Sequence, residues 1–382
     1  MASHFFDALR RYFNTYSSMF CRRDRNLWVF GAWFGNKFSD NPKYLFLYCL
    51  KHGKNVAWIT RNPDVFKEMS EQGLPVYMHD TKEAVSICRK AGYCICCTGV
   101  KDASRSHLGG AVFINLWHGV PLKKIVYDDI YSKVTVKQKI YQIITAIPFR
   151  KEYYFSTSNQ VSRIYRSCFA TDEKHIIQIG QVRNDMFFDG SLKRIHYSDV
   201  DYKKLLVYMP THRNEGQTEI NLERIFDLED LNDFCKENGL LFLIKKHYYH
   251  QNEKTDLSAY SNIIDYTSLP CDTQELLFNA DILVTDYSSC YIDYLLLDRP
   301  IVFYNYDYEE YLKKDREMYY NYEDVTPGGK AENYYEFRAA LKKALNGNEA
   351  FCTEHNRVKN LFYSKENQGP VCKKTIEAIE KL

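Results

Sequence analysis

The sequence lacks any run of about 18 uncharged apolar residues, the length that a helix needs to cross a membrane. We also expect no secretory leader, since the first residues contain neither an uninterrupted apolar stretch nor a small-residue cleavage site. Twelve cysteines are present, but they are scattered and most lie in apolar runs, which favours reduced thiols over disulfides. We therefore predict a cytoplasmic protein without a membrane-spanning segment.

Other absences narrow the function. The net charge is only +2, so bulk electrostatics do not favour nucleic acid, and cationic function must come from local clusters. Cys94, Cys96 and Cys97 lack the second pair of ligands that a zinc site needs, which favours structural burial in a strand. No Asp-x-Asp pair stands at an expected strand end. We therefore expect that the protein does not require a metal ion for activity, although Mg²⁺ could stimulate that activity. Repeats and low-complexity segments are absent too.

Apolar runs alternate with helical patterns along the chain, which is typical of α/β domains with parallel sheets. The expected strands are 28–34, 56–60, 93–98, 111–117, 153–156, 205–209, 240–245, 262–266, 281–285 and 301–304. The expected helices include 43–52, 222–238, 273–279, 289–297, 333–345 and 353–381. The polar stretch 172–202 is interpreted as a linker. We predict an amphipathic helix at 1–25, Rossmann-like domains at 26–190 and 191–350, and a helical segment at 351–382.

The most informative segment is residues 281–304. It predicts an apolar strand, a turn with Ser288 and Ser289, a helix and a second strand. The turn would lie at the carboxyl edge of a parallel sheet, where helix N–H groups and serine hydroxyls suit phosphate. Asp286 is expected to shape the turn. The alternative is that the serines only cap the helix, and this segment alone does not decide between the two.

One strand of the first half ends in a Trp-His-Gly turn, formed by Trp117, His118 and Gly119. Glycine gives this turn backbone freedom, and the imidazole would lie at the carboxyl end of a strand. Histidine is the side chain most easily used as a general base near neutral pH. Taken alone, the pattern favours a hydrogen-bonded structural histidine over a catalytic one.

Two strands of the second half end in cationic groups. Thr211 and Arg213 follow the strand at 205–209, and the guanidinium could grip a phosphate through two hydrogen bonds. Lys245 and His247 end the next strand. Several strand ends with basic or hydroxyl groups indicate one polyanionic ligand rather than a series of coincidences.

With these motifs in this order, the chain resembles the CDP-glycerol glycerophosphotransferases, a family of teichoic acid primases and polymerases and related capsule enzymes. The similar segments are 28–35, 40–46, 117–124, 180–185, 210–213, 245–247, 280–289 and 299–307. Two residues depart from the family pattern, since Val182 and Tyr248 stand where proline is usual. The resemblance covers roughly residues 27 to 345, and the departures affect local loop geometry.

The resemblance implies transfer of an alditol phosphate, glycerol phosphate first of all, from a CDP-alditol donor to a hydroxyl group, with release of CMP. The acceptor would be a lipid-linked glycan or a growing teichoic-acid-like or capsule polymer. The implied fold has two Rossmann-like domains facing a cleft, of glycosyltransferase B type, with the C-terminal helix crossing back. One alternative is a nucleotide-sugar glycosyltransferase of the same architecture for cell-surface polysaccharide, which would release a nucleoside diphosphate. A catalytically silent lipid- or nucleotide-binding module is the other.

The residue roles follow from the resemblance and from the needs of the reaction. Attack on the β-phosphorus requires a base for the acceptor proton and cations for the pyrophosphate. The resemblance implies His118 as the base, with Trp117, Gly119 and Lys123 on the acceptor side. His247 would bond or protonate phosphate oxygens. The remaining expected donor-binding residues are Thr211, Arg213, Lys245, Ser288, Ser289 and Asp293, the last with a purely helical role left open.

A lipid-linked acceptor requires contact with a bilayer, so we expect peripheral attachment to the anionic inner face of the cell membrane. Two basic, aromatic-rich segments are candidates, with docking on the protein itself as the alternative for each. The first carries Arg10, Arg11, Arg22, Arg23 and Arg25 beside Phe5, Leu9, Phe13, Tyr16 and Phe20. The second carries Lys133, Lys137, Lys139, Arg150 and Lys151 beside Tyr131, Tyr141, Ile143, Ile144 and Phe149. Homo-oligomerisation is left open.

Overall fold

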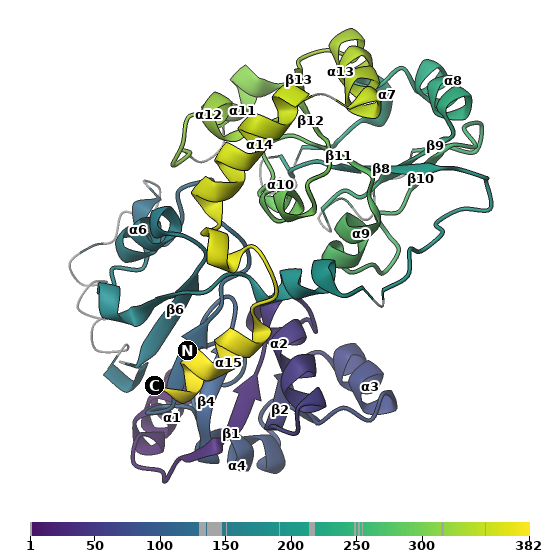
Figure 1. Ribbon diagram of the computed structural model, residues 1–382. Helices are drawn as coiled ribbons and strands as arrows, with labels where there is room; N and C mark the ends of the chain where they lie inside the picture. Colours follow the sequence, from purple (N-terminus) through teal and green to yellow (C-terminus); the bar gives the residue numbers. More distant parts are fainter. Residues whose placement is uncertain are drawn as a thin grey trace. The chain divides into compact units, whose positions relative to one another are not determined.

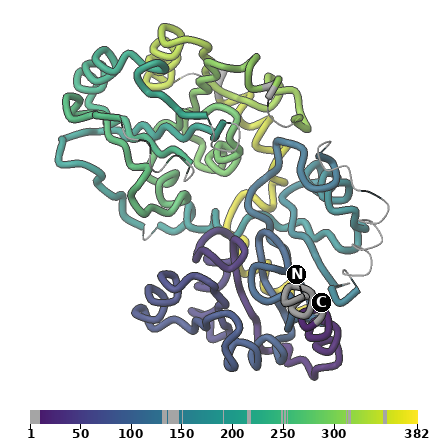
Figure 2. The backbone as a smooth tube through the Cα atoms, turned by 180° about the vertical axis from the view of Figure 1, so that it is seen from behind, coloured from purple at the N-terminus to yellow at the C-terminus, as the bar shows by residue number. Residues whose placement is uncertain are grey.

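The chain divides into two compact units (Figure 1). Unit 1 comprises Met1–His118, Val126–Asp185 and Gly369–Leu382, and unit 2 comprises Gly119–Ile125 and Met186–Gln368. Figure 2 traces the chain through both units in its sequence colours. The computed structural model describes residues 2–129, 135, 147–149, 151–190, 192–213, 218–247, 250, 253, 255–314, 317–347 and 349–382.

Unit 1 is built on a parallel sheet with the strand order β3-β2-β1-β4-β5-β6-β7. The strands are β1 Asp24–Phe30, β2 Asn55–Thr60, β3 Val76–Met78, β4 Ala91–Cys96, β5 Val112–Asn115, β6 Glu152–Ser156 and β7 Ile176–Gln178. The strand order reverses between β1 and β4, which is the doubly wound pattern. Ligands bind such sheets beyond the carboxyl ends of the strands.

Helices cover both faces of this sheet because its strands are apolar on both sides. Trp28 and Phe30 of β1 belong to one core, together with residues of α2 and α15, whereas Val29 belongs to a second core with Ala84 and Cys88 of α4. The helices of unit 1 are α1 Ala2–Ser18, α2 Asp40–Lys51, α3 Pro63–Glu71, α4 Lys82–Lys90, α6 Asn159–Cys168 and α15 Cys372–Glu380. Short 3₁₀ turns include Trp33–Gly35 and Val182–Phe188, the latter starting at one of the two positions that depart from the family pattern.

Unit 2 contains a second parallel sheet, with the order β10-β9-β8-β11-β12-β13 and its reversal between β8 and β11. Its strands are β8 Lys204–Met209, β9 Leu240–Ile244, β10 Ile263–Asp265, β11 Ile282–Thr285, β12 Ile301–Tyr304 and β13 Gly329–Ala331. Its helices are α7 Leu222–Ile225, α8 Leu228–Asn238, α9 Thr273–Asn279, α10 Cys290–Tyr294, α11 Tyr308–Lys314, α12 Tyr322–Val325, α13 Tyr334–Asn346 and α14 Glu349–Phe362. The predicted α/β class with parallel sheets is thus confirmed. The glycosyltransferase B arrangement of the units stays a prediction.

Several expected elements are shorter or divided. The helix expected at 222–238 is two helices, since Phe226 is extended and the Asp227 carboxylate caps α8 by accepting the N–H of Asp230 at 3.1 Å. The expected linker holds β7, which pairs with β6. The segment 353–381 is divided between α14 and α15, and α15 packs against α2 in unit 1.

The first helix is shorter than expected, because α1 ends at Ser18 and β1 begins at Asp24. Its end is docked on unit 1: the Ser18 hydroxyl accepts the N–H of Gly109 at 2.9 Å. Arg23, predicted to belong to a basic surface, instead donates to the carbonyls of Ser18 and Cys88 at 2.7 Å each. Phe13 and Phe20 are 73% and 89% exposed. The side chains of Phe5 and Leu9 lie outside the described part.

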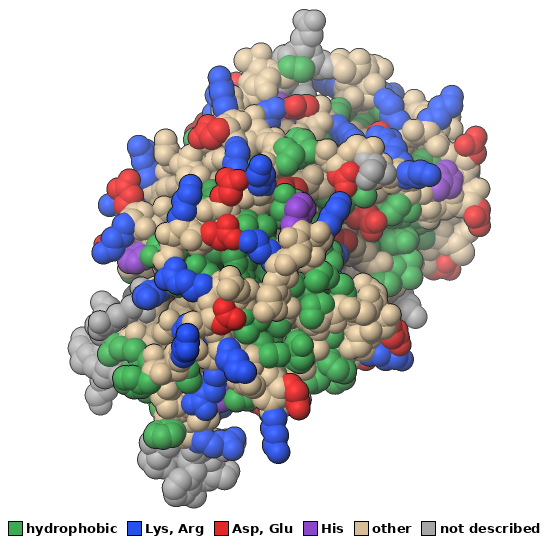
Figure 3. All heavy atoms as spheres, turned by 60° about the horizontal axis from the view of Figure 1, so that its bottom comes forward, with side chains coloured by type: hydrophobic (Ala, Val, Ile, Leu, Met, Phe, Trp, Pro, Cys, Tyr) green, Lys and Arg blue, Asp and Glu red, His purple; other side chains and the backbone are tan. Residues whose placement is uncertain are grey.

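Most of the second basic segment also lies outside the described residues: Tyr131, Lys133, Lys137, Lys139, Tyr141, Ile143, Ile144 and Arg150. The same holds for Tyr248. Phe149 is buried against Phe113, with ring centroids 5.1 Å apart, so it is not a surface aromatic. Within the described residues, no helix combines the length and apolar character needed to span a bilayer. Figure 3 shows basic and acidic side chains interspersed on one face, in keeping with the small net charge.

Candidate active site

His118 of unit 1 follows β5 with its ring held in one orientation. Its Nδ1 lies 2.9 Å from the carbonyl oxygen of Cys97, the residue that follows β4. A carbonyl oxygen can only accept, so Nδ1 carries the proton in the neutral ring. Nε2 then keeps its lone pair, which is the state a general base requires.

Two tryptophan rings flank this imidazole. The centroid of Trp117 lies 4.2 Å and that of Trp33 5.0 Å from the centroid of His118. Burial lowers the pKa of His118 below its usual value, and the nearby Asp40 carboxylate opposes part of this shift. A lowered pKa keeps the ring neutral at neutral pH, so it can accept a proton.

Backbone strain gathers around this histidine. Trp33, Phe34, Asp40 and Trp117 have φ of 49°, 59°, 64° and 54°, in the left-handed region that residues other than glycine rarely adopt. Such conformations persist where the surroundings hold them, and they cluster at functional sites. This observation favours a functional His118 over a structural one.

A network of hydrogen bonds holds the main chain of the turn that contains Trp117 and His118. The Arg183 guanidinium donates to the carbonyl of His118 at 3.0 Å and to the Asp40 carboxylate at 2.7 Å. The Asn41 amide donates to the carbonyl of Trp117 at 2.9 Å and accepts the N–H of Arg183 at 3.1 Å. Reasoning from the residues missed this network, although its members stand in segments that resemble the family.

Two residues expected beside His118 belong to the other unit. Gly119 and Lys123 are part of unit 2, where Lys123 pairs with Met318 in an isolated β-bridge. The Lys123 ammonium lies 4.9 Å from the centre of the Tyr311 ring. Of the residues expected on the acceptor side, Trp117 therefore shares a unit with His118.

Arg213 in unit 2 is part of a buried ion cluster rather than an open phosphate clamp. Its guanidinium donates to Asp307 at 2.6 and 3.0 Å, to Asp286 at 2.8 Å and to the carbonyl of Thr211 at 2.6 Å. Four hydrogen bonds leave little of the five-donor fork for a ligand. The two carboxylates outweigh the effect of burial and raise the pKa of Arg213 above its usual value.

The polar groups of Thr211 and Lys245 are likewise hydrogen-bonded to other parts of the protein. The Thr211 hydroxyl donates to Asp286 at 2.7 Å, and its N–H donates to the same carboxylate oxygen at 2.9 Å. Asp286 thus ties β8 to β11, in line with the turn-shaping role expected of it. The Lys245 ammonium donates to the carbonyls of Tyr266 and Leu269 at 3.0 and 2.7 Å. Burial lowers the pKa of Lys245.

The end of β9 carries a second buried group that reasoning from the sequence did not single out. The Lys246 ammonium forms an ion pair with Glu253 at 3.2 Å, and His250 contacts the same carboxylate at 2.6 Å. His247 lies on this loop, and its ring centroid is 4.8 Å from that of His212 at the end of β8. The structure therefore brings two histidines together where only one was predicted.

The serine turn keeps polar groups at the surface. Ser288 and Ser289 are partly exposed, and the Ser289 side chain makes no capping hydrogen bond to α10. The Ser288 hydroxyl accepts the N–H of Cys290 at 3.4 Å. Asp293, in contrast, is buried and accepts hydrogen bonds from Tyr363 at 2.6 Å and Gln274 at 3.2 Å. These contacts favour the helical role that was left open for Asp293.

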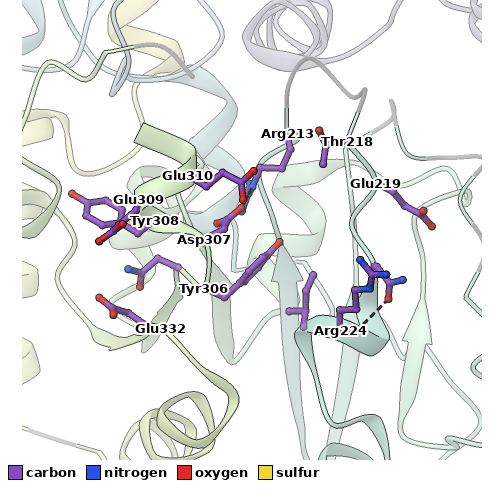
Figure 4. A pocket seen from close by; sticks show the side chains of 13 residues that line it. Arg213, Thr218, Glu219, Arg224, Tyr306, Asp307, Tyr308, Glu309, Glu310 and Glu332 are labelled. Carbon is purple, nitrogen blue, oxygen red and sulfur yellow. Dashed lines mark hydrogen bonds and ion pairs between the residues drawn. The ribbon is translucent and has the colours of Figure 1, made fainter. Parts of the chain in front are cut away.

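A cavity of about 850 Å³ lies at the carboxyl edge of β8, β12 and β13 (Figure 4). In Figure 4, Arg213 lies beside Asp307, and Arg224 lies on the opposite side of the cavity. The acidic lining residues are Glu219, Asp307, Glu309, Glu310 and Glu332. Five carboxylates against Arg213 and Arg224 give the cavity an excess of negative charge, which opposes the binding of a diphosphate there.

Cys94, Cys96 and Cys97 are fully buried, as the structural interpretation predicts. Burial raises the pKa of each thiol well above its usual value, so the thiols are protonated and inert. In the part of the chain that the structure describes, no group of three or more His, Cys, Asp or Glu residues could hold a metal ion.

Two doubly wound parallel sheets define an α/β protein of the class that binds its ligands beyond the carboxyl ends of the strands. Solved structures show the same fold. The wall teichoic acid polymerase TagF matches with a TM-score of 0.76 and 25% identity, over 97% of this chain and 92% of that one. A further TagF structure, obtained after a soak with CDPG, matches at 24% identity and the same TM-score.

Sequence comparison gives the particular family. The chain belongs to the CDP-glycerol:poly(glycerophosphate) glycerophosphotransferase family, whose profile matches residues 14–381. A teichoic acid poly(glycerol phosphate) polymerase of Staphylococcus epidermidis is 30% identical over 78% of this chain, which spans 43% of that protein. A teichoic acid glycerol-phosphate transferase of Staphylococcus aureus is 27% identical over 90% of this chain and 89% of its own length. The predicted family and the predicted enzyme class are thus confirmed.

Proposed function

We propose that this protein transfers an alditol phosphate, glycerol phosphate first among the candidates, from a CDP-alditol to a hydroxyl of a teichoic-acid-like or capsule polymer carried on a lipid, releasing CMP. His118 is the proposed base for the acceptor proton. The hydrogen bond from its Nδ1 to Cys97 carries this proposal, because it leaves Nε2 as the proton acceptor. Family membership supports CDP-glycerol as the donor.

On the donor side, we assign direct phosphate contacts to Ser288, Ser289 and His247. The serines are partly exposed at the switch point of the unit 2 sheet, where parallel sheets bind their ligands. The other expected donor-binding residues support the site indirectly by holding the strand ends, because their polar atoms already have protein partners. They are Thr211, Arg213, Lys245 and Asp293. Lys245 still contributes positive charge near the site, because its partners are neutral carbonyl groups, whereas Asp286 and Asp307 balance the charge of Arg213.

The experiment that tests the activity is a donor screen with CDP-glycerol, CDP-ribitol and nucleotide sugars, scored by the nucleotide released. Release of CMP from a CDP-alditol supports the proposal, and release of a nucleoside diphosphate from a nucleotide sugar supports the glycosyltransferase instead. We expect treatment with a metal chelator to leave turnover unchanged, because cationic side chains and helix N–H groups neutralise the charge of the pyrophosphate.

The role of His118 is tested by His118→Ala. We expect turnover to fall by about 10²–10⁴-fold with donor affinity unchanged, since the base acts on the acceptor proton. His247→Ala should lower both turnover and donor affinity. The matched control is His52→Ala, because the His52 Nδ1 also lies at 2.8 Å from a backbone carbonyl but sits on the exposed end of α2. Near-normal turnover of His118→Ala would remove it from the reaction.

We further propose peripheral attachment to an anionic membrane surface. The described part of the first basic segment supports it, since Phe13 and Phe20 are exposed beside exposed Arg10 and Arg22. Each basic residue near such a surface contributes about 1 kcal/mol, and salt weakens the attraction. We expect co-sedimentation with anionic but not neutral vesicles, reduced by salt and by Phe13→Ser with Phe20→Ser.

A second variant changes the residues of the other segment to glutamine: Lys133, Lys137, Lys139, Arg150 and Lys151. Loss of binding in this variant alone would assign the contact to residues 123–151. Absence of vesicle binding by the intact chain would contradict the attachment and leave the acceptor to be captured by its headgroup.

A further inference from the structure

Asp102 is a buried acid to which the proposed reaction gives no role. It lies in the loop after β4 and is fully buried. Its carboxylate accepts four hydrogen bonds: from the N–H groups of Cys97 and Thr98 at 2.8 and 2.7 Å, from the N–H of Phe34 at 2.7 Å, and from the Thr98 hydroxyl. A carboxylate held this way fixes the backbone around it, because each lost bond would leave a buried donor unsatisfied.

Two of these bonds end on the structures that hold the imidazole of His118. Cys97 donates its N–H to Asp102 and accepts the His118 Nδ1–H with its carbonyl. Asp102 also accepts the N–H of Phe34, which holds the left-handed loop formed by Trp33 and Phe34. The Trp33 ring of this loop packs against His118. One side chain therefore anchors both the partner of Nδ1 and a ring that packs on the imidazole.

The main chain of Asp102 has no room to shift toward β1. A Cβ atom on Gly31, which follows β1, would lie 2.2 Å from the carbonyl oxygen of Asp102 and 2.9 Å from the nitrogen of Ala103. Contacts this short are not tolerated, so the glycine lets the loop pack directly on the end of the strand. The end of β1 thus limits where the main chain of Asp102 can lie.

We propose that Asp102 is a positioning residue that fixes the Nδ1–H tautomer and the orientation of His118 through the Cys97 carbonyl and the Trp33 loop. A carboxylate is suited to this task because both of its oxygens accept. An asparagine of the same size has one acceptor oxygen and turns an NH₂ group toward N–H donors. The proposal rests on the proposed function of His118 for its kinetic consequence, but its structural consequence can be measured without turnover.

The direct measurement is the ¹⁵N NMR spectrum of the full chain labelled at histidine, with the His118 signals identified by their loss in His118→Gln. We expect a single Nδ1–H tautomer in the unchanged protein and a mixture of tautomers in Asp102→Asn. Thr98→Val removes one donor and keeps the carboxylate, so it should shift the spectrum less and in the same direction. This milder variant decides the matter if Asp102→Asn does not fold.

The kinetic measurement uses CMP release. Groups that orient a metal-bound histidine contribute about 10–100-fold, and we expect a loss of similar size in kcat for Asp102→Asn with KM for CDP-glycerol unchanged. The double variant with His118→Ala should be no slower than His118→Ala, because the two residues act as a unit. The control is Asp185→Asn, whose carboxylate accepts two N–H groups at 2.7 Å from residues 371 and 372 in the same unit.

The two measurements separate the possible failures. If His118→Ala retains turnover, the proposed role of His118 as base fails, while the tautomer in Asp102→Asn still decides the role of Asp102. An unchanged single tautomer in both Asp102→Asn and Thr98→Val would overturn the proposal. Multiplication of the two kinetic losses in the double variant would also overturn it, because independent effects multiply.

Discussion

Replacing Arg213 with methionine should destabilise unit 2 more than it weakens donor binding. Arg213 is only 7% exposed. The change keeps an unbranched apolar side chain but removes the guanidinium, which donates four hydrogen bonds. Asp286, which is fully buried, and Asp307 would then lose their shared cation. Breaking a buried ion pair by removing one partner costs about 3–5 kcal/mol. A direct phosphate contact would instead change donor affinity by about 1.5–3 kcal/mol.

The distribution of tryptophan allows the two units to be followed separately. All four tryptophans, Trp28, Trp33, Trp58 and Trp117, lie in unit 1. Urea unfolding followed by circular dichroism reports both units, whereas tryptophan fluorescence reports unit 1. We expect Arg213→Met to lower the midpoint seen by circular dichroism and to leave the fluorescence transition in place.

The control for this prediction is Arg224→Met. Arg224 lines the same cavity but is exposed, so its replacement should change the free energy of unfolding by no more than about 0.5 kcal/mol. Adding Asp307→Asn to Arg213→Met should restore part of the lost stability, because one unpaired carboxylate is removed. A loss below about 1 kcal/mol for Arg213→Met, combined with a weaker affinity for CDP-glycerol by calorimetry, would refute the cluster as a structural element.

Three further predictions concern pH, packing and metal. Because burial lowers the pKa of His118, kcat/KM should stay high below pH 6.5 and fall only as pH drops through the lowered pKa. Asp40→Asn should move this fall to lower pH, because the Asp40 carboxylate raises the pKa of His118. A fall that begins above pH 6.5 would contradict the assignment of His118 as base. Gly109→Ala should cost about 1–3 kcal/mol and expose α1 to limited proteolysis, since the new Cβ would lie 2.4 Å from the carbonyl oxygen of Thr15. EDTA should leave CMP release unchanged, and recovery of a lost activity by Mg²⁺ would show a metal requirement.

The sequence predicted the order of strands and helices well because each pattern is local. The helix expected at 273–279 has those bounds in the structure, and the strand expected at 301–304 does too. Some short strands were not predicted. β7 and β13 each have three residues, so their period cannot be read, and their pairing with β6 and β12 comes from tertiary contacts.

The candidate site was predicted in part, since the types and strand-end positions of its residues were recognised while their partners were not. Arg213 stands at a strand end, as a phosphate ligand would, but Asp307, 94 positions later, takes its donors first. Asp102 belongs to no local pattern, and its importance is visible only through the backbone groups that it holds. Competition among distant polar groups for the same donors decides such roles, and a single sequence does not display it.

The path of the chain between the units has a consequence for how the protein can be divided. The chain passes from one unit to the other after His118, Ile125, Asp185 and Gln368. A single cut at any of these positions therefore leaves at least one unit lacking a segment, and expressing residues 1–185 alone would omit α15 with its apolar residues Ile376 and Ile379. Unit 1 is completed by residues 369–382, which are synthesised after the whole of unit 2. Unit 1 therefore cannot reach its final fold until α15 has been synthesised.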